Sequence, residues 1–522
     1  MDNLISRLVS WKVSLRTSSR LQPWHWLTVL CFLQLLFWTL GPWLVRQTLV
    51  YDTLESIVWG SLWQWGYDKH PPLTAWLTAC IAGTVDDPDL PIYLLAQVCV
   101  VVTFWAVWRL AREFLSAHAA LTSSFLLLGV TYYSNRVERV TPDTLQSPIW
   151  ALLVLSFYFA VTESARGRAL RFWFFSGILA GLAILTKYQA AVLLICLFVI
   201  MISTDKGLQC WRTAGPWLGA ITALAIIAPH IHWLMENNFV SVSYLNSNYI
   251  DNPEYGQGHL SDHLVVPVNF LGSALANLVP LALIVWPLAK LRNTAPGNDS
   301  FQARFLTVVA TGPLLLTALC GMITGEELIP RWATPYFAWL PLWLLVMLRI
   351  EINESRFLKT AYTCLLTGLI LWCLRIGYLY WKPYITDDYW KADEFLPARE
   401  EMARAETLWQ AHFPSKLHFL GGQHYHVTGL TAYSQGKVIP FLGLDPRQSQ
   451  WMTEKEFRKE GGIIVIRQGN RETSPVRDRL QNHYPEAEYL GTFSTRPKIP
   501  IAIKNPTMSV VEYYLLRPEI WP

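Results

Sequence analysis

The sequence predicts an α-helical, polytopic membrane protein that ends in a small soluble α/β domain. Of its 522 residues, 52% are hydrophobic and 15% are charged, and the mean hydropathy is +0.26. A soluble domain of this size would carry more charge. Eleven apolar runs are long enough, or nearly so, to cross a hydrocarbon core of roughly 30 Å. From about Trp381 the composition changes to a water-soluble pattern.

The predicted membrane domain covers residues 24–380. A further run, 73–85, is short and stops at Asp86-Asp87-Pro88, so we expect it to lie on the membrane surface. The eleven runs expected to cross are 24–46, 91–111, 117–134, 144–162, 170–186, 188–204, 214–233, 265–289, 303–322, 335–349 and 359–380.

Basic residues predict the orientation of the helices. Residues 1–23 hold four basic side chains before a run that is too long for a signal-peptide core, so we expect an uncleaved cytoplasmic N-terminus. Eleven crossings then put residues 381–522 outside. The loops placed in the cytoplasm all contain Lys or Arg, as the positive-inside rule requires, and these are 109–113, 165–171, 205–212, 290–293 and 349–359.

Residues 381–522 alternate between helical and strand-like patterns, which predicts a small α/β domain. No glycine-rich nucleotide motif occurs at a strand-to-helix turn, so a nucleotide cofactor is not indicated. The net charge of +4 is spread over loops, which argues against a nucleic-acid partner. Helical spacing occurs at 394–409 and strand-like runs at 417–422, 437–443, 461–468 and 510–517.

The first outside loop, 47–90, concentrates ionisable side chains beside apolar runs, which suggests a functional site. Asp52 and Glu55 are three apart and share one face of a helix. They could form a catalytic pair or a capping box, and the two roles are compatible because a capping carboxylate can still face a cleft. Two prolines follow Lys69 and His70 and would hold them in place. The alternative is a plain loop with a snorkelling lysine.

The first-loop pattern of Asp-x-x-Glu, then Gly-Tyr-x-Lys-His-Pro-Pro-Leu-x-x-Trp (52–76), resembles family 39-type, membrane-embedded (C-type) glycosyltransferases. These include protein O-mannosyltransferases, lipid A aminoarabinose transferases and lipopolysaccharide uronosyl- and hexosaminyltransferases. Thr141-Pro142-Asp143 is similar to the Pro-Asp motif of the family, and weaker similarity occurs at 186–188, 229–238 and 330–335. The resemblance spans residues 24 to about 350.

The resemblance implies a C-type glycosyltransferase fold and sugar transfer from a polyprenyl-phosphate donor. The acceptor would be a hydroxyl or phosphate on lipid A, lipopolysaccharide or another cell-surface glycan, at the outer face of the bacterial inner membrane. Asp52 would be the general base, with Glu55 and Asp143 supporting or sharing that role. Several members have adjacent first-loop acids, so both Asp52 and Glu55 stay candidates. A metal-ligating acid of the aminoarabinose transferases falls on Lys69 and is not carried over.

Transfer from a sugar phosphate needs positive charge beside the leaving group. Arg331 is the first choice, because a guanidinium binds phosphate through two hydrogen bonds. Arg136 and Arg139 could instead snorkel to lipid headgroups. The candidate phosphate-binding cations are Lys69, Arg136, Arg139, Lys187 and Arg331. The candidate substrate-binding residues are Tyr67, His70 and His232.

A divalent metal ion is a further alternative. Neutral imidazoles with carboxylates suit such an ion, although histidines spaced across a loop more often form hydrogen bonds. The candidate ligands are His232, His259, Asp262 and His263. Two other function classes stay open, a transporter or flippase for a lipid-linked or anionic substrate and a non-catalytic scaffold. Transporters commonly show internal repeats with midplane charges, whereas the ionisable residues here gather at one face.

Overall fold

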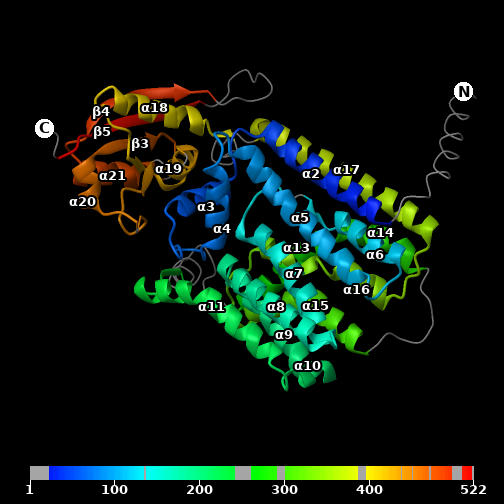
Figure 1. Ribbon diagram of the computed structural model, residues 1–522. Helices are drawn as coiled ribbons and strands as arrows, with labels where there is room; N and C mark the ends of the chain where they lie inside the picture. The colour runs from blue at the N-terminus through cyan, green and yellow to red at the C-terminus, as the bar shows by residue number, and fades with distance from the viewer. Residues whose placement is uncertain are drawn as a thin grey trace, which may run out of the picture.

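The chain folds into a helical membrane domain and an α/β domain that lies at one end of it (Figure 1). The computed structural model describes residues 23–134, 137–241, 260–290, 300–385, 395–434, 436, 438–449, 451–469, 472–496 and 508–519.

Within these residues, seven helices are long and apolar enough to cross a membrane. Two more, α13 (Asp262–Ala276) and α14 (Val279–Ala289), are bent by 62° and make an eighth span if they are counted together. The seven are α2 (Pro23–Val45), α5 (Asp89–Ala111), α7 (Pro142–Thr162), α8 (Arg166–Thr186), α11 (Gly215–Glu236), α15 (Ser300–Thr324) and α17 (Glu354–Ile385).

The remaining predicted runs also contain helix, but in shorter pieces. Because these pieces are shorter than a full span, the count of eleven crossings stays a prediction. They are α6 (Ala117–Phe125) with η1 (Leu126–Gly129) and η2 (Thr131–Tyr133), α9 (Ala190–Ser203), and η4 (Pro330–Phe337) with α16 (Leu340–Met347). The short helix α10 (Asp205–Cys210) follows α9.

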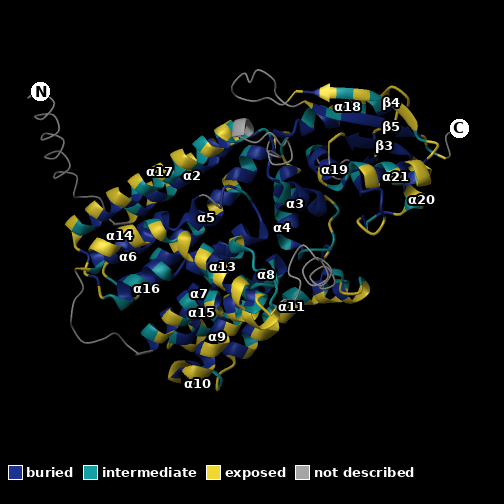
Figure 2. Cartoon of the chain, turned by 180° about the vertical axis from the view of Figure 1, so that it is seen from behind, coloured by how far each residue is buried: buried dark blue, intermediate teal, exposed yellow. Residues whose placement is uncertain are grey.

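Helix α7 lies at the centre of the membrane domain. Its apolar window is 89% buried, against 17% for α11 and 28% for α17. The outer faces of α2, α11 and α17 carry the exposed side chains (Figure 2), where lipid would cover them. The N-terminus of α7 is therefore a rigid, enclosed position from which to present a side chain.

The first loop forms two short helices, α3 (Tyr51–Ser61) and α4 (Leu73–Ala82), between the membrane domain and the α/β domain (Figure 1). A Cβ atom at Gly60 would lie 1.9 Å from the carbonyl oxygen of Ala75, so only glycine permits the close approach of the two helices. Helix α4 covers the run expected on the membrane surface, and it is too short to cross a membrane.

The α/β domain is built on a five-stranded sheet of order β2-β1-β3-β5-β4. Strands β1, β2 and β3 are parallel, whereas β5 is antiparallel to both β3 and β4. The strands are β1 (Phe419–Gly422), β2 (Ile439–Leu442), β3 (Gly462–Arg467), β4 (Glu488–Thr495) and β5 (Ser509–Leu516), and the helices are α18 (Ala398–Gln410), α19 (His424–Thr431), α20 (Glu454–Glu460) and α21 (Thr473–His483).

All four predicted strands and the first helix of this domain are confirmed. Strand β4 was not predicted, because its sequence EYLGTFST has Gly491 in the middle and its pairing with β5 is irregular between Tyr489 and Gly491. The predicted domain boundary at 380/381 falls within the last two turns of α17.

The α/β domain is docked on the first loop through Arg399 of α18. Its Nη2 lies 2.7 Å from Asp87 Oδ1 and 2.8 Å from Asp89 Oδ2, and Nη1 donates to the Gln47 carbonyl oxygen at 2.7 Å. The Tyr433 hydroxyl also donates to Asp89, at 3.0 Å. Because Asp89 is buried, this cluster fixes the domain against the membrane domain.

Candidate active site

Asp52 is in the first turn of α3 and does not cap it. The N-cap residue is Val50, and no side chain caps the helix there. The capping-box alternative for Asp52 and Glu55 is therefore wrong. Both carboxylates are instead directed to partners outside the helix.

The Thr-Pro-Asp motif begins α7. The Thr141 hydroxyl accepts a hydrogen bond from the Thr144 amide at 3.3 Å, and Pro142 takes the first helical position. Asp143 follows in the first turn. Asp52 and Asp143 thus lie at the N-termini of two different helices, where the helix dipole favours a negative charge.

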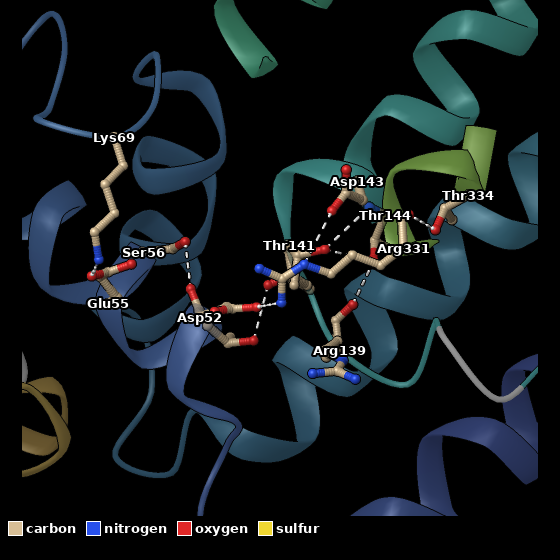
Figure 3. A network of polar contacts seen from close by, with 12 residues as sticks. Asp52, Glu55, Ser56, Lys69, Arg139, Thr141, Asp143, Thr144, Arg331 and Thr334 are labelled. Carbon is tan, nitrogen blue, oxygen red and sulfur yellow. Dashed lines mark hydrogen bonds and ion pairs between the residues drawn. The ribbon is translucent and has the colours of Figure 1, made fainter. Parts of the chain in front are cut away.

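Arg331 connects these two carboxylates (Figure 3). Its Nη1 donates to Asp52 Oδ2 at 2.7 Å, and its Nε lies 3.9 Å from Asp143 Oδ2. The η4 backbone holds Arg331 in place, because Thr334 donates to the Arg331 carbonyl at 2.6 Å and Tyr132 donates to the Pro330 carbonyl at 2.7 Å.

Lys187 completes the enclosure of Asp143. Its ammonium donates to Asp143 Oδ1 at 2.6 Å and lies 5.0 Å from the centre of the Trp332 ring. Burial lowers the pKa of Lys187, although the Asp143 charge opposes this shift. Lys187 comes directly after α8, where its extended backbone ends the helix.

Arg139 adds a further cation. Burial lowers its pKa. The charge of Arg331 acts in the same direction, whereas the charges of Glu138 and Asp52 raise the pKa. We refer to Asp52, Arg139, Asp143, Lys187 and Arg331 as the Arg331 cluster. With three cations and two carboxylates, its formal charge is +1. A single phosphodiester, which carries one negative charge, would balance it.

Glu55 has different partners from Asp52. Lys69 donates to Glu55 Oε1 at 2.5 Å, and the Tyr51 hydroxyl donates to the same oxygen at 3.1 Å. Burial alone would raise the pKa of Glu55, but Lys69 and His424 together outweigh this effect and lower the pKa to about 2. Lys69 is therefore engaged by Glu55 and is not a member of the Arg331 cluster.

His70 lies between the two sets of charges. Its burial and the positive charge of Lys187 lower its pKa to about 3, whereas Glu55 and Asp143 oppose the shift. His70 is consequently a neutral hydrogen-bonding group at neutral pH. Its contact to substrate stays a prediction.

Tyr67, also predicted to contact substrate, is only 2% exposed. Its ring stacks on Trp59 at 5.4 Å, and its hydroxyl accepts a hydrogen bond from the Gln64 amide at 3.3 Å. The structure assigns it to the interior of the loop. It supports the site without lining it.

His230 contacts the first loop, whereas His232, two residues further along α11, does not. His230 Nδ1 donates to the Trp65 carbonyl at 2.6 Å, and its Nε2 accepts from Tyr188 at 2.9 Å. Two residues along a helix correspond to about 200° of rotation. His232 therefore points elsewhere, is 70% exposed and pairs with Glu236 at 3.3 Å.

Among the described residues, no group of three or more His, Cys, Asp or Glu side chains is arranged to hold a metal ion. His263 Nδ1 donates to the Met322 carbonyl at 2.9 Å. The predicted combination of His232 and His263 with Asp262 is thus not formed. His259, the fourth predicted ligand, and Arg136, a predicted phosphate-binding residue, fall outside the described residues.

The α/β domain contributes two side chains that the sequence analysis missed. His424 Nε2 lies 3.8 Å from Glu55 Oε1, and the Tyr425 ring lies 4.3 Å from the Tyr51 ring. Both residues directly follow a parallel strand, at the edge where α/β sheets commonly bind ligands. Their position after a predicted strand could have identified them in the sequence, but only the folded chain shows that this edge of the sheet faces α3.

Comparisons with known proteins agree with this arrangement. Residues 69–233 match the family described as dolichyl-phosphate-mannose-protein mannosyltransferase. The lipopolysaccharide core galacturonosyltransferase RgtB of Rhizobium johnstonii is 22% identical over 302 residues, which is 55% of this chain and 58% of that protein. The chain thus matches a little over half the length of this relative.

Among solved structures, ArnT from Cupriavidus metallidurans bound to undecaprenyl phosphate superposes with a TM-score of 0.61 and 13% identity, over 94% of this chain and 98% of that one. The apo state of the same protein gives the same values. The fold is therefore that of the membrane-embedded C-type glycosyltransferases. The resemblance to the protein mannosyltransferase and ArnT-like members of that class, inferred from the first-loop and Thr-Pro-Asp motifs, is confirmed.

Proposed function

We propose that this protein is a glycosyltransferase that moves a sugar from a polyprenyl-phosphate donor to an acceptor hydroxyl. The acceptor would belong to lipid A, lipopolysaccharide or another cell-surface glycan. The likeness to RgtB and to ArnT supports the donor and acceptor classes. The observation that carries the proposal is the sharing of Arg331 by Asp52 and Asp143, which places a base beside a cation.

In the proposed reaction, Asp52 takes the proton of the acceptor hydroxyl while the hydroxyl oxygen attacks C1 of the sugar. The bond between C1 and the phosphate oxygen breaks, and its electron pair stays on the phosphate. General-base catalysis of this kind contributes typically about 10²–10⁴-fold. Arg331 and Lys187, with Arg139 close by, stabilise the charge on the departing polyprenyl phosphate.

Three features favour Asp52 over Glu55 as the base. Asp52 contacts the same cation as Asp143, whereas Glu55 is paired with Lys69. The Asp52 side chain is 31% exposed and can meet an incoming hydroxyl, but that of Glu55 is 8% exposed. The low pKa of Glu55, about 2, also makes it a weak base. Asp143 would hold Arg331 and Lys187 in place.

We further propose that the enzyme resides in the bacterial inner membrane with its α/β domain in the periplasm. The Lys and Arg residues of the opposite loops support this orientation. A polyprenyl tail would keep the donor in the bilayer, because each buried CH₂ group contributes about 0.8 kcal/mol. The phosphosugar would then reach the Arg331 cluster from the membrane.

The test uses the purified full-length protein in lipid nanodiscs with a panel of polyprenyl-phosphate sugars. Free polyprenyl phosphate is the product whichever sugar and acceptor are used, so its release is measured by mass spectrometry. Acceptor-dependent release is the expected result. Movement of the intact donor across a vesicle bilayer, with no polyprenyl phosphate released from any donor, would contradict the proposal and favour a transporter.

A further inference from the structure

Another polar group lies between the two domains. It consists of Tyr51, Glu55 and Lys69 from the membrane domain and His424 and Tyr425 from the α/β domain, and we call it the interdomain cluster. Helix α19 lies against α3 (Figure 1), and Figure 2 shows the same arrangement from behind. The reaction proposed above makes no use of this cluster.

Local backbone geometry aims α19 at α3. Gly422 ends β1 with φ of +145°, and a Cβ atom there would lie 2.1 Å from the Val465 carbonyl oxygen, so only glycine fits. The turn it permits places His424 and Tyr425 at the start of α19, beyond the carboxyl ends of the parallel strands. Ligands of α/β sheets bind at that edge.

His424 presents a ring nitrogen that suits a hydroxyl group. His424 Nδ1 lies 3.2 Å from Gln448 Oε1, and because an amide oxygen only accepts, Nδ1 carries the hydrogen. In the neutral ring Nε2 is then an acceptor. It faces Glu55 Oε1, another acceptor, at 3.8 Å, which is too long for a hydrogen bond. Glu55 Oε1 already accepts from Lys69 and Tyr51, so a ligand hydroxyl would donate to His424 Nε2, whose side chain is the more exposed of the two.

Aromatic side chains complete the cluster. Tyr425 is 42% exposed, and its ring packs at 50° to that of Tyr51. An exposed aromatic face can pack against the C–H groups of a sugar ring, while its hydroxyl stays polar. Lys69 and Glu55 neutralise each other, so this pair offers a ligand no net charge, and the cluster suits an uncharged, hydroxyl-rich group better than an anion.

The cluster is close enough to the Arg331 cluster for one acceptor sugar to reach both. Glu55 lies three residues after Asp52 on α3, about 4.5 Å further along the helix axis. His70 is influenced by Lys187 and Asp143 on one side and by Glu55 and Lys69 on the other. The distance of about 4.5 Å along α3 from Asp52 to Glu55 is comparable to the width of one sugar ring.

We propose that the interdomain cluster is the acceptor subsite and that it binds the uncharged sugar ring whose hydroxyl is glycosylated. This inference rests on the proposed function and extends it, because it makes the acceptor a carbohydrate and gives the α/β domain a part in recognising it. Tyr425 contacts the ring face, and His424 accepts a hydrogen bond from one of its hydroxyl groups.

The test measures the donor and acceptor dependence of polyprenyl phosphate release separately, with full-length Tyr425→Ala and His424→Gln. Lipid A and delipidated core oligosaccharide, from a strain lacking this protein, are offered as separate acceptors. Each variant is expected to raise the KM for one of these acceptors about tenfold while the donor KM stays within about twofold. Tyr425→Phe, which keeps the ring, should restore the acceptor KM.

Matched controls are Tyr489→Ala and His412→Gln, exposed residues that contact Tyr514 and Leu408 of the same domain. An acceptor KM that is unchanged in both variants, or a donor KM that rises equally, would overturn the acceptor subsite. Failure of the wild-type protein to release polyprenyl phosphate from any donor would instead contradict the proposed function. The two failures are therefore distinguishable.

Discussion

Asp52 and Asp143, which are 91 residues apart in the sequence, lie on either side of a single guanidinium group. Arg331 approaches Asp52 Oδ2 to 2.7 Å and Asp143 Oδ2 to 3.9 Å. Each carboxylate begins a different helix, so three separate elements meet at this point. In the proposed reaction these positions bring the base and the phosphate-binding cation together.

Replacing Arg331 tests its role at the phosphate. Arg331→Ala should lower kcat by about 10²–10³-fold and raise the donor KM, because the leaving phosphate loses its main partner. Arg331→Lys should recover part of the loss, since an ammonium supplies charge but not two parallel hydrogen bonds. Steady-state kinetics with varied donor measure both. Arg168→Ala, at an arginine 67% exposed, is the control; an equal rise in donor and acceptor KM would contradict this role.

Asp68 provides a test of the electrostatics of the first loop. Its burial raises the pKa to about 6, although Lys69 opposes the shift. The native state therefore binds this proton more tightly than the unfolded state does, and stability falls as the pH rises from about 4 to about 6. Asp68→Asn removes the penalty and should raise the unfolding temperature above pH 6 by on the order of 1–3 °C.

Below about pH 3, where Asp68 is mostly protonated in both states, the Asp68→Asn variant and the wild-type protein should unfold at the same temperature. Thermal unfolding in detergent at several pH values measures the difference. Asp478→Asn, at an exposed aspartate of the α/β domain, is the control. A stabilisation that is the same at pH 4 and pH 7.5 would show that the effect does not come from the ionised carboxylate.

Arg399 should determine how firmly the α/β domain is docked. Arg399→Ala removes three contacts to the first loop and leaves the buried Asp89 carboxylate without this cation. We expect faster cleavage between the domains in limited proteolysis and weaker acceptor binding. Arg517→Ala, which breaks an exposed pair inside the α/β domain, should change neither. A proteolysis rate equal to that of the wild-type protein would argue against docking through Arg399.

The orientation in the membrane can be tested by cysteine labelling. After the exposed Cys80, Cys320 and Cys373 are replaced by serine, single cysteines are introduced as Lys416→Cys in the α/β domain and Gly167→Cys in the first turn of α8. Both positions are exposed, and a Cβ atom at residue 167 meets no atom within 4 Å. An impermeant reagent added outside should label the first and not the second. The reverse pattern would place the α/β domain in the cytoplasm.

Most of the fold was predictable because its signals are local. Apolar runs identify membrane helices, and strand-like runs located four of the five strands. Glu55 and Lys69 were predicted as site residues because charge next to hydrocarbon is rare. Asp143 was predicted from its similarity to a motif, and its place at a helix N-terminus explains that motif.

The remaining features depend on tertiary contacts. Asp52 and Glu55 are equivalent in the sequence, and only the positions of Arg331 and Lys69 separate their roles. His230 and His232 are likewise equivalent until the rotation of α11 places one of them against Trp65. His424 lies 369 residues after Glu55, so no local pattern connects them.

The central claim is that Asp52, and not Glu55, removes the acceptor proton. The most direct test compares kcat for Asp52→Asn and Glu55→Gln in the nanodisc assay at saturating donor and acceptor, with Glu113→Gln, at an exposed ion pair, as control. We predict that Asp52→Asn lowers kcat by at least about 100-fold, whereas Glu55→Gln stays within about tenfold of the wild-type value. A larger loss in Glu55→Gln than in Asp52→Asn would contradict the assignment.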